Sequence, residues 1–326
     1  MPTKLIYQST EIPNDGDDTV LSALLRHGID VPHSCESGVC QSCMIRCDQG
    51  ELPAASQKGL KATLAAQKYF LACQCKLSQC GDEELHVSID SSALFVDAKL
   101  ASKEKVAPHI AKLVLSLQSP IDYEPGQFVH LRRADGLVRS YSIASGPSEG
   151  TQIELHISRV PNGKMSTFLL DEFSVGDTLS LRGPSGDCFY VKGSPEQSML
   201  LIGTGTGLAP LLGIVRSALV NEHSGGIHLY HGSINRDGLY LIEELEELAS
   251  LHTNLHYHPC IDEGDGGTRI SVVRAADLAW KQHSDLKAWR IFLCGHPAMV
   301  KSGKKRAYLL GASISEIHSD PFEIGS

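Results

Sequence analysis

The chain has 326 residues, 42% of them hydrophobic and 21% charged, which predicts two or three globular domains that each bury a core. Its net charge of −9 argues against a nucleic-acid-binding protein, because such proteins need a basic face. No apolar run is long enough for a membrane-spanning helix, and the first residues lack the basic-then-apolar pattern of an export signal. The ten cysteines then predict a reducing compartment, and we expect a cytoplasmic protein without membrane insertion.

Three cysteines form a Cys-x4-Cys-x2-Cys run, and a fourth follows thirty positions after the last of them: Cys35, Cys40, Cys43 and Cys73. Four thiolates at this spacing match the pattern that binds a plant-type [2Fe–2S] cluster, with two protein sulfurs for each iron. Zinc is the alternative metal, but zinc sites usually contain two Cys-x2-Cys pairs and this region has one. Cys75, two residues beyond Cys73, competes as the fourth ligand.

The residues around these cysteines predict a first domain over residues 1–95. An apolar stripe over 19–27 predicts a helix that Asp17 or Asp18 caps and that Gly28 ends. Strands are expected on either side of it, at 4–7, 44–47 and 85–89. This order of strand, helix, cysteine loop and strand resembles the plant-type ferredoxin domain, which has a β-grasp fold. In that family the fourth ligand follows a small residue and precedes Gln, Leu or Val, which favours Cys73 over Cys75.

The second region, 98–192, is dominated by segments in which apolar and polar residues alternate: 110–117, 127–131 and 153–157. Turn-forming residues such as Pro125-Gly126 separate these segments. Several short strands at this spacing predict a small antiparallel β-barrel.

A motif within this region, Arg139-x-Tyr141-Ser142, combines side chains that suit a phosphorylated aromatic cofactor. Arginine binds phosphate through a bidentate fork, tyrosine offers a ring for stacking, and serine adds a small donor near a polar ring edge. A surface strand with an ion pair is the alternative for this motif by itself. The motif resembles the flavin-binding signature of the ferredoxin–NADP reductase superfamily, and the segment with Lys164 and Ser166 resembles the part of that family that meets the flavin pyrophosphate. The resemblance implies FAD rather than FMN, because in FMN-containing relatives the ferredoxin domain comes last.

The third region, 195–326, begins with a continuous apolar run over 198–202, which predicts a parallel strand buried on both faces. A glycine-rich loop follows and leads into a predicted helix: Gly203, Thr204, Gly205, Thr206 and Gly207. Strand, glycine loop and helix form a phosphate site in dinucleotide-binding α/β domains. This loop departs from the usual Gly-x-Gly-x-x-Gly pattern, but it resembles the Gly-Thr-Gly-x-Ala-Pro stretch of the same superfamily. A second helix is expected over 241–251, with its acidic residues facing solvent.

Near the end of the chain, Cys294-Gly295-His-Pro297 follows another apolar run. It resembles the family segment whose cysteine lies beside the reacting nicotinamide carbon and shapes the pocket without forming a covalent bond. A buried small residue is the alternative for Cys294. The choice between NADH and NADPH depends on the residues after the second nucleotide strand. Ser233 and Arg236 suit the 2′-phosphate of NADPH, whereas Asp237 opposes it, and the preference of the resembling reductases leads us to expect NADH.

One further cluster is not expected to bind metal. His252, His256, His258 and Cys260 lie close together in the sequence, but their spacing fits no single helix face. The sequence also shows no convincing Ser/His/Asp or paired-carboxylate arrangement.

Over its whole length the chain resembles the NAD(P)H-dependent reductase component of bacterial multicomponent oxygenases. The resemblance implies a relay in which hydride passes from the nicotinamide to FAD, and single electrons leave through the cluster to an oxygenase or hydroxylase component. A plant-type cluster has a reduction potential near roughly −400 mV, which suits that direction. Two alternatives remain: the same relay with another acceptor, such as a deoxysugar dehydratase, and a redox sensor without physiological turnover.

Overall fold

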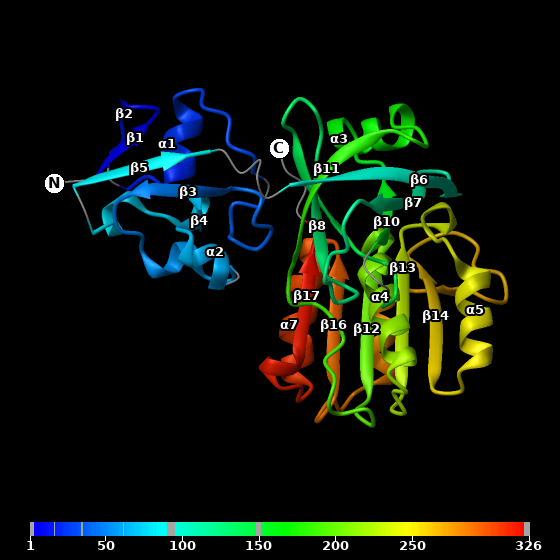
Figure 1. Ribbon diagram of the computed structural model, residues 1–326. Helices are drawn as coiled ribbons and strands as arrows, with labels where there is room; N and C mark the ends of the chain where they lie inside the picture. Colours follow the sequence, from blue (N-terminus) through cyan, green and yellow to red (C-terminus); the bar gives the residue numbers. More distant parts are fainter. Residues whose placement is uncertain are drawn as a thin grey trace.

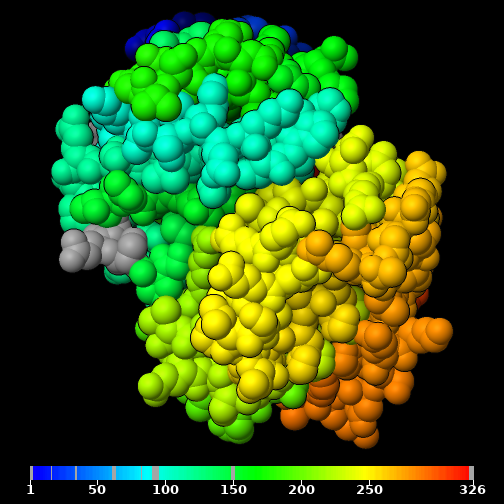
Figure 2. Space-filling view, turned by 90° about the vertical axis from the view of Figure 1, so that its right-hand side faces the viewer, coloured from blue at the N-terminus to red at the C-terminus, as the bar shows by residue number. Residues whose placement is uncertain are grey.

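The computed structural model describes residues 3–322 apart from residues 16, 34, 61, 82, 90–94 and 148–150. Three β-sheets follow one another along the chain (Figure 1). The cysteine-rich unit lies beside the antiparallel sheet, and the parallel sheet stands below that sheet in the same view. Figure 2, seen from the side away from the first unit, shows the second and third units packed directly against each other. Within the described residues, no helix is long and apolar enough to cross a bilayer.

The first sheet has the strand order β2-β1-β5-β3-β4, with β1 parallel to β5 and the other pairs antiparallel. Its elements are β1 (Lys4–Tyr7), β2 (Thr10–Ile12), α1 (Val20–Arg26), β3 (Met44–Gln49), α2 (Ala62–Ala66), β4 (Tyr69–Leu71) and β5 (Glu84–Ser88). Residues of α1 and of β1, β3 and β5 share one hydrophobic core. This mixed sheet with its helix is the predicted β-grasp fold.

The start of α1 differs from the prediction. Thr19, not Asp17 or Asp18, caps the helix, because its side chain accepts a hydrogen bond of 3.1 Å from the backbone N–H of Ser22. Asp18 instead forms an ion pair with Arg26. Gly28 has a φ of +74°, as expected for the glycine that follows a helix end.

The second sheet is antiparallel throughout, with the order β10-β7-β6-β11-β8-β9. Its two outer strands meet where Ile143 bridges to Leu155 and the Ala144 N–H donates to the Glu154 carbonyl at 2.8 Å, which closes the predicted barrel. The strands are β6 (Val96–Ala107), β7 (Ile110–Leu117), β8 (Phe128–Arg132), β9 (Val138–Ser142), β10 (Gln152–Ser158) and β11 (Thr178–Ser185). A short helix, α3 (Lys164–Thr167), continues into a π-helical turn, Phe168–Glu172.

The third sheet is parallel throughout, with the order β15-β14-β13-β12-β16-β17. Its strands are β12 (Met199–Thr204), β13 (Ile227–Ser233), β14 (Leu255–Ile261), β15 (Ser271–Val272), β16 (Arg290–Gly295) and β17 (Ile317–Pro321). The helices are α4 (Leu208–Val220), α5 (Ile242–Leu251), α6 (Ala275–Gln282) and α7 (Pro297–Leu309).

The apolar run of β12 is buried on both faces, as its composition predicts. Met199 and Leu201 belong to a core shared with α4 and α5, whereas Leu200 and Ile202 belong to a core shared with α6 and α7. Strand order and helix placement make this an α/β unit whose strands end at one common edge. The three-part fold class is therefore confirmed, whereas the domain limits at 95, 98, 192 and 195 stay predictions.

Candidate cofactor site

A cavity of about 460 Å³ lies where the three units meet. The cysteine loop contributes Cys35 and Cys40, the barrel contributes all of β9 and the start of α3, and the parallel unit contributes Thr206 and Ala209. The last described residues, Asp320, Pro321 and Phe322, complete the wall. A cofactor that fills this cavity would therefore contact all three units at once.

Strand β9 supplies the Arg139-x-Tyr141-Ser142 motif to this cavity. Arg139 is half-buried, and its Nη1 donates to the Val138 carbonyl at 2.8 Å, which leaves its other donors available. Burial raises the pKa of the Tyr141 phenol, so this group stays protonated. Ser142 is buried at the carboxyl end of the strand. The structure thus brings the three motif side chains to one wall.

Ser142 has a partner that sequence analysis missed. Its hydroxyl donates to Asp320 Oδ2 at 2.7 Å, across 178 positions of sequence. Asp320 lies on β17, opposite Cys294 of β16 in the sheet. Burial raises the pKa of Asp320 to about 6, although the hydrogen bond from Ser142 opposes that shift. No local sequence signal could identify this pair, because only the packing of β17 beneath the barrel creates it.

Lys164 and Ser166 also line the cavity, at the start of α3. The Ser166 hydroxyl donates to the Gly163 carbonyl and accepts from the Val160 N–H, both at 3.1 Å. A Cβ on Gly163 would come within 2.7 Å of that hydroxyl, so the turn requires glycine. Ser166 thereby fixes the shape of this turn, and the exposed Lys164 brings the positive charge.

The glycine loop after β12 is wedged against the end of β16. A Cβ on Gly207 would lie 2.3 Å from the Cys294 carbonyl oxygen, and Gly205 has a φ of +55°. The Thr204 hydroxyl accepts a hydrogen bond of 3.0 Å from the His296 N–H. Of the five predicted loop residues from Gly203 to Gly207, Thr206 reaches the cavity wall.

Cys294 is fully buried, and its sulfur lies 3.6 Å from that of Cys188. Burial raises the pKa of its thiol well above the usual value, so the group is neutral. Cys294 is not among the described residues that line the cavity, although its backbone abuts the glycine loop. Its predicted place beside a nicotinamide stays a prediction.

Ser233 and Arg236 lie at the carboxyl end of β13, beyond the cavity wall. Ser233 is half-buried and Arg236 is exposed, in a turn that the Asn235 side chain caps by accepting from the Asp237 N–H. A Cβ on Gly238 would lie 1.9 Å from the Ser233 hydroxyl oxygen, so this turn is tightly packed. The two residues therefore share one edge, where open α/β sheets bind nucleotides.

The four predicted cluster cysteines come together as two pairs, Cys35 with Cys40 and Cys43 with Cys73. In each pair, hydrogen bonding between the two sulfurs lowers the pKa of one thiol, to about 4 for Cys35 and to about 7 for Cys73, and raises that of the other. The Cys40 and Ser37 N–H groups point at the Cys35 sulfur, at 3.3 and 3.4 Å. Among the described residues, no three His, Cys, Asp or Glu side chains converge on one point that could hold a single metal ion. Two pairs of thiols suit a binuclear cluster better than a mononuclear zinc site.

Cys73 and Cys75 differ in their surroundings. Cys73 faces Cys43 and accepts from the Gln74 side chain at 3.4 Å, whereas the Cys75 sulfur lies 3.8 Å from that of Cys80. Cys73 therefore lies with another predicted cluster ligand, whereas Cys75 lies beside Cys80, which is not one of them.

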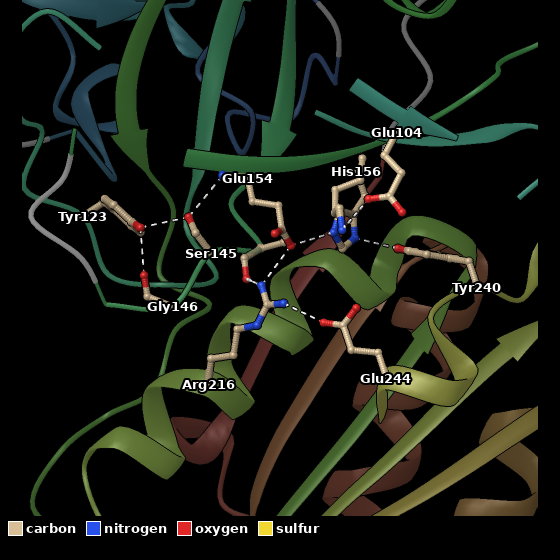
Figure 3. A network of polar contacts seen from close by, with 11 residues as sticks. Glu104, Tyr123, Ser145, Gly146, Glu154, His156, Arg216, Tyr240 and Glu244 are labelled. Carbon is tan, nitrogen blue, oxygen red and sulfur yellow. Dashed lines mark hydrogen bonds and ion pairs between the residues drawn. The ribbon is translucent and has the colours of Figure 1, made fainter. Parts of the chain in front are cut away.

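Polar contacts fasten the barrel to the parallel unit behind the cavity (Figure 3). His156, on the cavity wall, bonds Glu154 at 3.0 Å and the Tyr240 hydroxyl at 2.9 Å. Arg216 of α4 donates to Glu154 at 2.8 Å and to Glu244 of α5 at 3.0 Å. Burial works to raise the pKa of Glu154, but the bond from His156 and the charge of Arg216 outweigh it and lower that pKa to about 2.

Three family descriptions match consecutive parts of the chain. They are a 2Fe-2S iron-sulfur cluster binding domain over residues 6–78, an oxidoreductase FAD-binding domain over 97–190 and an oxidoreductase NAD-binding domain over 201–305. The ferredoxin–NAD(P)+ reductase component of the naphthalene 1,2-dioxygenase system of Pseudomonas putida is 32% identical, over 96% of each chain. The chain belongs to the ferredoxin–NAD(P)+ reductase family. The reductase is thus an NAD(P)H-dependent oxidoreductase, and its domains imply a [2Fe–2S] cluster, FAD and an NAD(P) substrate.

Other relatives of the reductase agree with this assignment. The reductase subunit of an aromatic O-demethylase of Amycolatopsis is 33% identical, over 93% of each chain. The crystal structure of an Amycolatopsis cytochrome P450 reductase shares 30% of the sequence over 98% of each chain, with a TM-score of 0.70. A ferredoxin reductase in carbazole 1,9a-dioxygenase, 23% identical, has the same fold with a TM-score of 0.68.

Proposed function

We propose that the reductase transfers electrons from NADH through FAD and a [2Fe–2S] cluster to an oxygenase or hydroxylase component. The observation that carries this proposal is the single cavity whose walls include the cysteine loop, the Arg139-x-Tyr141-Ser142 motif and the end of the glycine loop. A flavin held there would supply hydride acceptance and one-electron release, which is the chemistry that the relay requires.

In this proposal the chain's own residues bind and orient that flavin. The Arg139 guanidinium and the Lys164 ammonium neutralise phosphate charge, and Tyr141 presents its ring face. Ser142 holds a hydroxyl at the polar ring edge, with Asp320 fixing its orientation. The nicotinamide nucleotide would be held at Gly203–Gly207, where three glycines let its phosphates approach the backbone. Cys294 supports that loop from below as a neutral thiol.

Cys35, Cys40, Cys43 and Cys73 are the proposed cluster ligands, two for each iron. Their pairing and the N–H groups directed at the Cys35 sulfur support this assignment. The same proposal includes three domains, at residues 1–95, 98–192 and 195–326, and a cytoplasmic location. The ten cysteines of the chain form no disulfide, which suits a reducing compartment.

The preference for NADH is supported by the charges around Arg236. Arg269 is held by ion pairs with Glu243 and Glu246, and Arg274 by one with Asp262, whose N–H donates to the Ser233 carbonyl. Asp237 adds a further carboxylate beside Arg236. Of the three described arginines Arg236, Arg269 and Arg274, a 2′-phosphate would therefore meet only Arg236 without an ion pair, among several acids. We expect a larger kcat/KM for NADH than for NADPH, and Arg236→Ala should lower kcat/KM for NADPH more than for NADH. A higher kcat/KM for NADPH would contradict the preference.

The identity of the electron acceptor is proposed from the relatives. Two reductase components of oxygenase systems are 32% identical to this chain and a third is 29% identical. A CDP-6-deoxy-L-threo-D-glycero-4-hexulose-3-dehydrase reductase of Yersinia pseudotuberculosis is also 29% identical. A dehydratase in deoxysugar synthesis is accordingly the second candidate acceptor. Single-turnover oxidation of the reduced reductase by a representative of each acceptor class separates the two.

Cys40→Ser tests the order of the relay. We expect the variant to lose reduction of cytochrome c, which takes single electrons from the cluster, and to keep reduction of ferricyanide, which takes them from the flavin directly. Steady-state assays with NADH and the two acceptors measure both. Equal loss of the two activities in a variant that retains its flavin would show that the electron order is wrong.

A further inference from the structure

Arg182 is a buried arginine at the contact between the barrel and the cysteine loop. It lies on β11, opposite His130 of β8, and 7% of its surface is exposed. Burying a guanidinium is unfavourable unless other groups compensate its charge and its donors. The partners of Arg182 should therefore indicate why the barrel keeps it there.

The hydrogen-bond partner of Arg182 belongs to the first unit, not to the barrel. Its Nη2 donates to the backbone carbonyl of Gln41 at 2.8 Å, between Cys40 and Cys43 in the sequence. Ser185, on the same strand, donates to the Gln41 side-chain carbonyl at 3.2 Å, and the Gln41 amide donates to the Gly59 carbonyl at 2.9 Å. Gln41 has a φ of +55°, so these contacts hold it in a left-handed backbone conformation that residues other than glycine rarely adopt.

The largest charge effects that favour the protonated form of Arg182 come from the cysteine loop. Burial lowers the pKa of Arg182 to about 10, so it remains charged at neutral pH, and the sulfurs of Cys43 and Cys40 oppose that shift. Among the described residues, no carboxylate forms an ion pair with it. Two further neighbours carry no charge: the Phe95 ring centre lies 5.2 Å from the guanidinium, and burial together with the Arg182 charge keeps His130 neutral by lowering its pKa.

We propose that Arg182 docks the cluster-binding loop on the flavin barrel through Gln41, and that its buried positive charge makes the [2Fe–2S] cluster easier to reduce. A reduced cluster carries one more negative charge than an oxidised one, so a fixed positive charge beside two of its ligands favours the reduced form. Arg182 is in this sense a positioning residue, because it acts on the cluster through its contact with the loop and through the electrostatic field of its guanidinium. The inference rests on the proposed ligation of the cluster by Cys40 and Cys43.

Replacing Arg182 by glutamine tests the charge while keeping an amide donor. We expect Arg182→Gln to lower the equilibrium constant for cluster reduction about tenfold, which for one electron is a shift of about 59 mV to more negative potential. Redox titration of the holoprotein, followed by electron paramagnetic resonance of the cluster and by flavin absorbance, measures both potentials. The flavin potential should change much less than the cluster potential.

Three further variants separate charge from contact. Arg182→Lys keeps the charge and should retain most of the cluster potential, even if the loop exchanges hydrogen faster. Ser185→Ala removes the second Gln41 contact without a charge, so its cluster potential should equal that of the parent. Arg132→Gln removes a neighbouring positive charge that stacks on Phe95, 4.1 Å from the ring centre, and should shift the potential less than Arg182→Gln does.

Two results would overturn the inference: an unchanged cluster potential in Arg182→Gln, or equal shifts in Arg182→Gln and in Ser185→Ala. A failure of the proposed ligation is distinguishable from both. In that case the parent protein itself would lack the [2Fe–2S] resonance signal, and no cluster potential could be compared.

Discussion

The hydroxyl of Ser142 and the carboxyl of Asp320 form a buried pair on the wall of the cavity, 2.7 Å apart. Each alone is an ordinary polar side chain, and the pair exists because β17 brings the end of the chain beneath β9. A carboxyl group with a pKa of about 6 changes charge just below neutral pH. Its protonation therefore decides whether the cavity floor carries a negative charge, and this has a measurable effect on stability.

Asp320→Asn should change how stability depends on pH. The folded protein holds the Asp320 proton more tightly, at a pKa of about 6, than the unfolded chain does at the ordinary 3.8. The free energy of unfolding contributed by this group is thus greatest below pH 4 and falls as the pH rises to 6, by about 3 kcal/mol in total. The asparagine variant should gain that amount relative to the parent over this range, as urea unfolding would measure. Parallel stability curves for the two proteins would refute the pKa shift.

Arg139→Ala should release the flavin and leave the cluster bound. The arginine sits on the cavity wall without an ion pair among the described residues, so its charge is available to phosphate. We expect flavin affinity to fall at least tenfold, since charge-assisted bonds contribute about 1.5–3 kcal/mol each. Flavin occupancy and cluster absorbance of the purified variant measure the two effects separately. Arg133→Ala, which removes a half-buried arginine paired with Asp135, is the matched control and should retain its flavin.

At the scale of single elements, the glycine loop is the segment whose shape depends most on the absence of side chains. It begins where β12 ends, and its last glycine packs on the backbone of β16. Strand, loop and helix α4 follow from local sequence: an apolar run, three glycines, and an apolar segment with proline in its first turn. The contact between this loop and β16 does not follow from the local sequence.

Gly207→Ala should weaken nucleotide binding. The added methyl group would lie 2.3 Å from the Cys294 carbonyl oxygen, so the loop backbone must move away from β16. We expect KM for NADH to rise roughly tenfold or more, because the displaced N–H groups no longer meet the phosphates. Gly226→Ala, at the start of β13 and facing only the end of the His228 side chain, is the control. A parent-like KM in Gly207→Ala would mean that the loop is not the phosphate site.

At the scale of the whole molecule, the arrangement of the cavity depends on contacts between the three units. Figure 3 shows how Glu154 and His156 of the barrel meet Arg216, Tyr240 and Glu244 of the parallel unit. Because His156 also lines the cavity, the same contacts that join the two units hold part of the cavity wall in place.

Arg216→Ala should loosen the joint between these two units. The Glu154 side chain is 16% exposed, so its carboxylate would remain largely buried without its main charge partner. We expect a loss of about 2 kcal/mol in unfolding free energy, below the 3–5 kcal/mol for breaking a fully buried pair. Calorimetry should also resolve two transitions where the parent shows a closer overlap. Arg269→Ala, which breaks an exposed ion pair within one unit, should cost much less stability than Arg216→Ala. A similar loss in both variants would contradict the role of the joint.

Element types were largely predictable from sequence, because burial patterns repeat along each segment. The strands expected at 4–7 and 110–117 match β1 and β7, and the helix expected over 241–251 begins one residue later. Strands with weaker patterns were missed, such as β17 and the long, mostly exposed β6. The prediction of the cap of α1 was wrong, because Thr19 and Asp18 are adjacent and only the backbone geometry decides which oxygen faces the Ser22 N–H.

The sequence by itself determined which cofactors this protein is built for, because thiolate spacing, the Arg-x-Tyr-Ser triplet and the glycine loop are local requirements that a few consecutive residues satisfy. Tertiary structure alone decided how these parts face one another. The Ser142–Asp320 pair, the Arg182–Gln41 contact and the joint around Glu154 each link residues distant in sequence. Such contacts have no periodicity for a pattern to reveal, since they depend on how the three units pack against each other.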